Sequence, residues 1–569
     1  TGQSPQVPMP FDPGHDCPFA SVLSSGNRFY THFNSNFCEY DPATRAFTFH
    51  AQTAPQMAMG MTEDDEGRIW SVTYPDSAVA CYDSASGEFR DYGSGDAQNW
   101  KQYQRSVATD DTGWLYFAVG NTASQIVALQ PDSGEARPLL AEEDRVQGSA
   151  FVYRDEDGVV YGLPLAGAED SDDWLRLYDG EAEPVGQHTE GQPKKIITEC
   201  QALFHREFPD GERLLECDTV DKRLVVESVD GQRRELRFDY DSEGAHLMGL
   251  AAAPDGTICG GTAFPMRFFR YDPGADEWTN RASFGQWNTV RQHEDRFFVG
   301  GYTGGFLLEW DPARPWQDTT KAAEATQNPR WWVATAPAIN RPHCLRVTGH
   351  GRYVLLGGTP GYGYTGGGLL IWDREKASGK LLEHGELVPE QAPMSLLELD
   401  DGSVLVGATV APGTGGEQKA TRAEMYCLDP TSQKVLWRQP VLEQVESYND
   451  LLQGPDELVL GFADCRRFFV FEAKTRRVVQ EEEVETRLGR TNGQQGPRIF
   501  VPGPAGEVFA LFQRGIVQIH DDGPGGRPRF RLELVAESPV PVEPGGDLLD
   551  GRIYFGSGSH MYSWGAPVP

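Results

Sequence analysis

The chain of 569 residues has no apolar run near the roughly 18 residues that a membrane-spanning helix needs, so no membrane partner is expected. Lysine is scarce, because only ten of the 50 basic residues are lysines. Acidic residues outnumber basic ones by 84 to 50, which gives a net charge of −34. Such a surface repels a phosphate backbone, so nucleic acid is not an expected partner.

Several sequence motifs are also missing. There is no GxSxG, Walker or CxxCH motif, and the twelve histidines show no HxH or HExxH spacing. The missing motifs argue against α/β-hydrolase, nucleotide-dependent and c-type haem chemistry, and a metal site would have to be assembled from histidines of different repeats. We expect no cofactor, although the acidic segment 168–174 is a candidate for structural Ca²⁺.

The nine cysteines include no CxxC pair, and several stand in apolar segments such as VACYD and MYCLD. This pattern predicts buried, reduced thiols, which slightly favours a cytoplasmic over a secreted protein. The sequence does not begin with methionine, and removal of a signal peptide or trimming of the chain would each explain that.

A repeated pattern runs along the whole chain. Residues 301–311 read GYTGGFLLEWD, and residues 363–373 read GYTGGGLLIWD. Both belong to a longer pattern of strand, Asp-Gly turn, strand, loop, and a third strand that ends in Tyr-Asp or Trp-Asp. About twelve such repeats begin near residues 25, 66, 112, 157, 210, 255, 294, 350, 401, 455, 505 and 550.

Short alternating strands with a period of roughly 40 to 55 residues are typical of β-propeller blades. The fold class is therefore all-β, a β-propeller of about twelve four-stranded repeats, and only 318–327 has a helix-like composition. A phosphate-binding loop would lead from a strand into a helix, whereas GYTGG leads into another strand. We interpret GYTGG as the turn between the second and third strands of a blade.

Two segments carry a family resemblance. LDPTSQKVLWR at 428–438 is similar to the signature of PQQ-like repeats, and EGRIWSVTYPDSAVACYD at 66–83 resembles a virginiamycin-B-lyase-like blade. The chain thus resembles the β-propeller superfamily with PQQ-like, Kelch-like and virginiamycin-B-lyase-like repeats. The resemblance covers nearly the whole chain, but its motifs are those of strands and turns and imply no catalytic residue.

Twelve repeats exceed one ring of four to eight blades, so we predict two propellers, divided seven plus five or six plus six. The Pro- and Ala-rich segment 318–332 is the predicted linker, with propellers at 1–317 and 333–569. Ring closure is expected to pair the two ends of the chain.

Propellers bind ligands at a mouth of the central channel, so the residues that begin each innermost strand are candidates. As catalytic acid or base groups we predict His343, Tyr448 and His246. As substrate-binding groups we predict Arg341, Arg105, Trp287, Asn288, Tyr364, Tyr302 and Asn449. His15 and Arg498 begin further innermost strands.

This inventory of His, Tyr, Arg and Trp predicts a lyase or glycosidase acting on a uronate-containing or decorated oligo- or polysaccharide. Arginine would neutralise the carboxylate, and His or Tyr would transfer the proton. The alternative is a non-catalytic propeller that binds a glycan or a protein, because most of the motifs are purely structural. A PQQ-dependent dehydrogenase is a third, weaker reading, since the repeated tryptophans expected of it are missing.

Overall fold

The structure is a computed structural model of the chain. It describes residues 6–13, 18–54, 56–96, 98–168, 170–188, 197–200 (backbone only), 207–208, 210–219, 221–240, 244–263, 265–317, 327–493, 496, 499–525 and 529–566. His15, Arg498 and all but the last residue of the helix predicted at 318–327 lie outside the described residues.

The chain forms two compact units, and each is described by itself. The first comprises Thr1–Ser242 with Thr414–Glu417, and the second comprises Glu243–Gly413 with Gln418–Pro569. In the described part of the chain, the first unit holds five antiparallel sheets and the second holds seven. The helical elements there are the 3-10 helix η1 (Glu142–Asp144) and α1 (Glu485–Leu488), so the predicted all-β class is confirmed.

The sheets of the first unit, in their order of pairing, are β17 (Ile197–Cys200), β1 (Ala20–Leu23), β2 (Phe29–Phe33), β3 (Asn36–Asp41) and β4 (Ala46–Gln52); β5 (Met57–Glu63), β6 (Arg68–Tyr74), β7 (Ala78–Asp83) and β8 (Glu88–Ser94); β9 (Val107–Thr109), β10 (Leu115–Val119), β11 (Gln125–Leu129) and β12 (Ala136–Pro138); β13 (Phe151–Arg154), β14 (Val160–Leu163), β15 (Trp174–Tyr178) and β16 (Glu181–Gly186); and β18 (Arg213–Asp218), β19 (Arg223–Glu227) and β20 (Arg233–Arg237).

The sheets of the second unit are β21 (His246–Ala252), β22 (Ile258–Ala263), β23 (Arg267–Asp272) and β24 (Glu277–Ala282); β25 (Gln286–His293), β26 (Arg296–Tyr302), β27 (Phe306–Trp310) and β28 (Arg330–Val333); β29 (Arg341–Thr348), β30 (Tyr353–Thr359), β31 (Gly368–Asp373) and β32 (Ser378–Glu383); β33 (Ala392–Glu398), β34 (Val404–Thr409), β35 (Met425–Asp429) and β36 (Lys434–Gln439); β37 (Tyr448–Gln453), β38 (Leu458–Ala463), β39 (Arg467–Glu472) and β40 (Arg477–Glu483); β41 (Phe500–Pro502), β42 (Val508–Phe512), β43 (Gly515–Asp521) and β44 (Phe530–Glu537); and β45 (Asp547–Leu549), β46 (Arg552–Ser557) and β47 (His560–Gly565).

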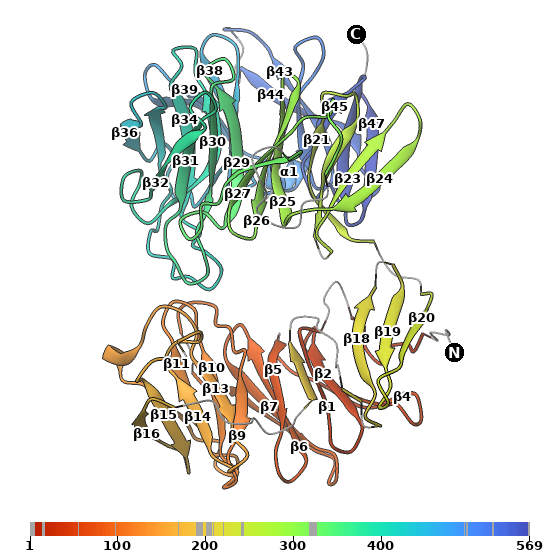
Figure 1. Ribbon diagram of the computed structural model, residues 1–569. Coiled ribbons are helices and arrows are strands. Elements are labelled where there is room, and N and C mark those ends of the chain that lie inside the picture. The colour runs from red at the N-terminus through yellow and green to blue at the C-terminus, as the bar shows by residue number, and fades with distance from the viewer. Residues whose placement is uncertain are drawn as a thin grey trace. The chain divides into compact units, whose positions relative to one another are not determined.

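The sheets of the second unit follow one another around a common centre, drawn from green to blue in Figure 1. The first strand of each sheet lies beside the first strand of the next, and β45 and β46 lie beside β21 again. Leu247 N donates to Gly558 O at 2.9 Å, and Ala252 N donates to Asp547 Oδ2 at 3.0 Å, which joins the last sheet to the first. This arrangement is consistent with the predicted β-propeller.

The sheets of the first unit also follow in chain order, since β1, β5, β9 and β13 lie side by side. The inner edge of β1 is covered by β17, which pairs with it antiparallel from Ala20↔Cys200 to Leu23↔Ile197. A first strand with both edges paired leaves no free backbone groups on that side.

The repeated Asp-Gly turns have a direct structural cause. Asp110 Oδ1 accepts the backbone N–H groups of Thr112 and Trp114, each at 3.0 Å, and Oδ2 accepts the Tyr116 hydroxyl at 2.9 Å. Gly113 has φ +90°, a conformation that glycine adopts without steric cost. The aspartate therefore closes the turn and also holds an aromatic side chain of the second strand.

The Tyr-Asp and Trp-Asp endings of the third strands start the following turn. In each case the aspartate Oδ1 accepts the N–H two residues later, at 2.8 to 3.1 Å. Four examples are Asp41, Asp83, Asp272 and Asp373. The dipeptide that marks each repeat in the sequence is thus a turn signal and not a ligand site.

The segment GYTGG joins the second and third strands of a sheet, as predicted. The first copy begins with the last two residues of β26 and leads into β27, and the second copy lies between β30 and β31. Gly305 shows why the segment is glycine-rich. Its φ is +59°, and a β-carbon there would lie 1.9 Å from Ile339 O. Only glycine fits this turn without displacing the neighbouring backbone.

The predicted linker at 318–332 does not end where a new sheet begins. Its residues 330–332 belong to β28, the fourth strand of the sheet β25–β28, and its residues 318–326 lie outside the described residues. The two compact units divide at residues 242 and 243 instead. The last sheet, β45–β47, lies beside β21 of its own unit, and so the expected pairing with the first strands of the chain is also corrected.

The described cysteines agree with the predicted reduced thiols. Cys38, Cys81, Cys259, Cys344 and Cys427 are buried, and Cys217 and Cys465 are half-buried. Burial raises the pKa of the Cys38 thiol to about 12, so this group stays protonated and unreactive at neutral pH. In the part of the chain that the structure describes, no helix has the length and apolarity to cross a bilayer.

Candidate functional site

Two predicted residues meet where the second strands end and the first strands begin in the second unit. Tyr302 ends β26, and Arg341 begins β29 of the next sheet, with its guanidinium 5.0 Å from the centre of the Tyr302 ring. The Tyr302 and Tyr362 hydroxyl oxygens are 2.6 Å apart. We call Tyr302, Arg341 and Tyr362 the Tyr302 cluster. It joins Tyr302, in the first GYTGG turn, to Tyr362, the residue just before the second copy at 363–367.

The environment of Tyr302 keeps its hydroxyl protonated. Burial raises the pKa of Tyr302 to about 12, the hydrogen bond to Tyr362 adds to the rise, and Arg341 opposes it. A phenol with this pKa is a poor general base at neutral pH but a good hydrogen-bond donor. The cluster is therefore rich in N–H and O–H donors, which suits an acceptor such as a carboxylate.

Tyr364 lies two residues after Tyr362, and its side chain is 42% exposed. Its backbone is held on both sides, because Tyr364 N donates to Gly361 O at 3.2 Å and Tyr364 O accepts the N–H of Gly413 at 3.0 Å. An aromatic ring on a fixed backbone that still faces solvent can stack on the apolar face of a sugar or an aromatic side chain.

The three predicted catalytic residues are not assembled into an acid–base site. Tyr448 is fully buried, packs against Phe469 with ring centres 5.8 Å apart, and its hydroxyl accepts the N–H of Leu442 at 3.1 Å. His343 is buried, with Nε2 3.0 Å from Thr359 Oγ1. His246 begins β21 with an exposed side chain. Tyr448 and His343 thus hold structural positions in the core, and a catalytic role for these three residues stays a prediction.

Two predicted binding residues are core residues of the second unit, which is a further correction. Trp287 has no exposed surface, and its ring lies 5.1 Å from that of Phe268. Asn288 is 1% exposed, and its Oδ1 accepts a hydrogen bond from Gln286 Nε2 at 2.7 Å. Side chains alternate between the two faces of a strand, and the sequence pattern did not show which residues of β25 face the neighbouring sheets.

The remaining two predicted binding residues are Asn449, in the second unit, and Arg105, in the first. Asn449 is buried, and its Oδ1 accepts the N–H of Cys465 at 2.8 Å, which fixes a turn of its own sheet. Arg105 is exposed and has its guanidinium 5.6 Å from the centre of the Tyr103 ring. Their predicted binding role stays a prediction.

Sequence reasoning missed five charged residues on the first strands of the second unit: Arg291, Arg346, Glu398, Asp450 and Asp547. Their charges act on one another although they come from five different sheets, because the first strands of successive sheets lie side by side. Burial lowers the pKa of Arg291 and that of Arg346, the latter to about 10. The three carboxylates accept backbone N–H groups at 2.8 to 3.2 Å. In the sequence, the signal for these residues was a single charged residue within an otherwise apolar strand.

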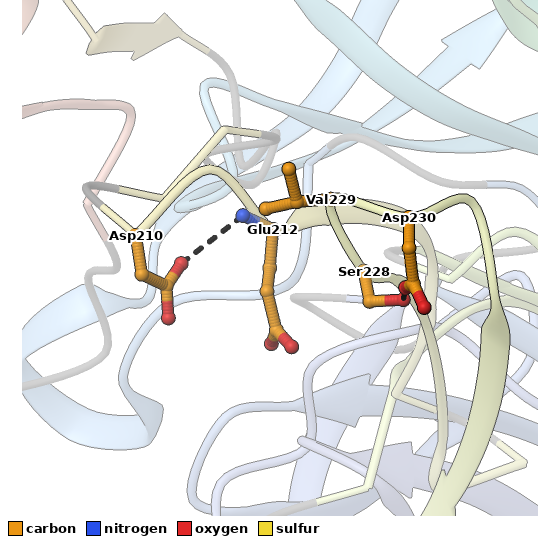
Figure 2. Close-up of a pocket in the computed structure, with 5 residues that line it drawn as sticks. All are labelled: Asp210, Glu212, Ser228, Val229 and Asp230. Atoms are coloured by element: carbon orange, nitrogen blue, oxygen red, sulfur yellow. Dashed lines mark hydrogen bonds between the residues drawn. The ribbon is translucent and has the colours of Figure 1, made fainter.

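Figure 2 shows a shallow cavity of about 520 Å³ formed by two turns of the sheet β18–β20. Asp210 Oδ1 accepts the N–H of Glu212 at 3.1 Å, and the Ser228 hydroxyl donates to Asp230. Val229 is 77% exposed between them. These hydrogen bonds are those of ordinary aspartate and serine turns, so we assign the cavity to turn structure.

Metal ligation is not indicated by the described residues, because no three His, Cys, Asp or Glu side chains among them are placed to hold an ion. In the acidic segment 168–174, Glu169 lies outside the described residues, so the predicted Ca²⁺ site stays a prediction.

Neither the models of known families nor the curated proteins include one that matches this chain. Among solved structures, similar chains include the extracellular domain of a candidate one-component system of B. thetaiotaomicron, with 12% identity and a TM-score of 0.38 over 98% of this chain and 72% of that one. PorZ, a surface component of the type IX secretion system of Porphyromonas gingivalis, matches with 13% identity and a TM-score of 0.36 over 97% and 74% of the two chains.

Hydrazine synthase of Kuenenia stuttgartiensis matches with 11% identity and a TM-score of 0.44, over 58% of this chain and 98% of that one. At 11 to 13% identity, none of these three similarities bears on the activity or partners of this chain.

Proposed function

We propose that this chain is a non-catalytic binding β-propeller that recognises a carboxylate-bearing glycan at the Tyr302 cluster. In this proposal, the seven sheets of the second unit form one closed seven-bladed ring, and the five sheets of the first unit are a second, smaller propeller. The alternative function predicted from the sequence is thus preferred over a lyase or a glycosidase.

The observation that carries the proposal is the composition of the Tyr302 cluster. Arg341 has no carboxylate of the described residues within 4.0 Å, although the chain holds 84 acidic residues. Its guanidinium interacts with the Tyr302 side chain, a neutral group, so its positive charge has no carboxylate partner among the described residues and suits a planar carboxylate of a ligand. Tyr364 adds an exposed ring close by in the sequence, which supports stacking on a sugar.

The same residues speak against proton transfer at this place. A lyase needs a base whose pKa lies near the working pH, and burial moves the Tyr302 pKa to about 12 instead. His343 and Tyr448, the predicted acid or base groups, are buried and hydrogen-bonded within their own sheets. The groups that remain are donors suited to binding.

The test is a binding screen of the full chain against uronate oligosaccharides and neutral oligosaccharides of the same length. We expect saturable binding of the uronate set only, with loss of affinity in Arg341→Gln and Tyr364→Ala. Arg233→Gln is the control, because this arginine is 73% exposed in the first unit. Binding of both sets alike, or an unchanged affinity in Arg341→Gln, would refute the assigned site.

Chemistry is tested on the same mixtures by absorbance at about 235 nm, where the unsaturated product of a uronate lyase absorbs. We expect a flat trace over hours, because burial raises the pKa of Tyr302 to about 12, too high for a base at neutral pH. A rising trace that is lost in Arg341→Gln would show a lyase and overturn the non-catalytic reading.

A further inference from the structure

A second groove lies at the other end of the same sheets. It has a volume of about 480 Å³ and is lined by Glu309, Arg330, Trp332, Gly349, His350, Gly351, Arg352, Arg374 and Glu375. We call it the Arg330 groove. Strand β29 begins at Arg341 and runs to the turn at Gly349, so about eight residues, or roughly 25 Å, separate it from the Tyr302 cluster.

The carboxylates of the groove already have partners. Glu309 Oε1 lies 3.1 Å from Arg374 Nη2, and Glu309 Oε2 accepts the indole N–H of Trp332 at 3.1 Å. Arg352 lies 2.8 Å from Asp373 and 3.4 Å from Glu375. The two glutamates that line the groove are therefore engaged with Arg352, Arg374 and Trp332.

Arg330 lines the same groove but takes no part in these ion pairs. Its guanidinium carbon lies 3.5 Å from the centre of the Trp332 ring, and no carboxylate of the described residues is within 4.0 Å of it. Its Nε is buried and makes no hydrogen bond in the described part of the chain. A partly buried cation without a counter-charge is costly, so the site favours an added anion at the guanidinium.

The planar shape of the Arg330 guanidinium indicates which kind of anion it would bind. The Trp332 ring holds the guanidinium flat, which fixes the direction of its N–H fork. A planar fork of this kind pairs with two oxygens of one anion at once. Arg352 and Arg374 line the same groove, and their charges are balanced by the carboxylates they pair with, so Arg330 carries the positive charge that is left unbalanced among the described residues.

We propose that the Arg330 groove binds a small oxyanion, a carboxylate or phosphate group, held bidentately by Arg330. This site is separate from the one in the proposed function and does not depend on it. The neighbouring groove offers a contrast: Arg476 lies 5.0 Å above the ring of Trp437, but Asp400, Asp401 and Glu457 line that groove and repel anions.

The experiment follows the indole N–H signals of the ¹⁵N-tryptophan-labelled full chain by NMR, with Trp332→Phe to assign the signal of interest. Inorganic phosphate and acetate are titrated separately at constant ionic strength, with chloride as the reference salt. We expect the Trp332 signal to move saturably with phosphate, with acetate or with both, which also identifies the preferred group.

Variants locate the binding. Arg330→Gln is expected to weaken it by about tenfold or more, and Arg330→Lys, which keeps the charge without the fork, by less. Arg476→Gln and Arg341→Gln are expected to bind as the original chain does, which separates this groove from the neighbouring groove and from the Tyr302 cluster. No saturable shift with either anion, or a shift that persists in Arg330→Gln, would overturn the proposal.

Discussion

The buried His32 of the first unit predicts how the protein responds to acid. His32 lies on β2 with no exposed surface, and its Nδ1 and Nε2 are each 2.9 Å from a hydroxyl, those of Ser71 and Thr53. Burial lowers the pKa of His32 from 6.5 to about 3. The folded chain therefore keeps this ring neutral over a pH range in which the unfolded chain protonates it.

The sign and size follow from proton linkage. Because the folded pKa is depressed for a base, the contribution to stability is intact above pH 6.5 and is lost as the pH falls from there to about 3. Each pH unit in that window costs about 1.4 kcal/mol, so the free energy of unfolding that depends on His32 falls by about 2 kcal/mol between pH 7 and pH 5.

The assay is amide hydrogen exchange of β2 and β3 at pH 7 and pH 5, corrected for the intrinsic exchange rates. In His32→Gln we expect the free energy of unfolding at pH 7 to be lower by about 1–3 kcal/mol, because a hydrogen bond is lost. Between pH 7 and pH 5 it should then fall by less than it does in the original chain. His50→Gln is the matched control, because His50 is exposed on β4 of the same sheet. Equal drops in the original chain and in His32→Gln would refute the argument.

Two further predictions concern the second unit. Trp287→Ala should lower its free energy of unfolding in urea by about 3–5 kcal/mol, because the fully buried ring leaves a cavity. Trp287→Phe should cost much less, since the indole N–H has no hydrogen-bond partner among the described residues; equal costs would contradict this. Burial raises the pKa of Asp547, so this carboxyl stabilises the fold below the unfolded pKa of about 3.9, and the contribution is lost as the pH rises through the folded pKa. Asp547→Asn should therefore lose less stability than the original chain between pH 4 and pH 7, and a parallel loss in both would disprove the shift.

Much of the local structure could be read from the sequence. The turn at Asp110 and the Asp83 and Asp373 endings are local signals, because the aspartate hydrogen-bonds backbone groups within a few residues. The near-copies at 301–311 and 363–373 also predicted a shared rim of Tyr302, Tyr362 and Tyr364, since the turns of adjacent sheets lie side by side. The hydroxyl oxygens of Tyr302 and Tyr362, 2.6 Å apart, agree with that expectation.

The position of side chains between sheets could not be read in the same way. Tyr448 and Trp287 begin innermost strands as predicted, but both turn into the core between sheets, a choice set by packing against Phe469 and Phe268. Residues 318–332 resembled a linker in composition, whereas the change of unit near residue 242 has no Pro- or Ala-rich segment to mark it. Packing between sheets and the division into units both depend on which sheets become neighbours, and the sequence does not show that.

The central claim is that Arg341 binds a carboxylate without catalysing a reaction on it. The most direct measurement is isothermal titration of a uronate oligosaccharide into the original chain and into Arg341→Gln. A saturable isotherm whose affinity falls by about tenfold or more in Arg341→Gln is the predicted result. Equal affinity in both proteins, or heat that continues after saturation because the glycan is being cleaved, would contradict the account.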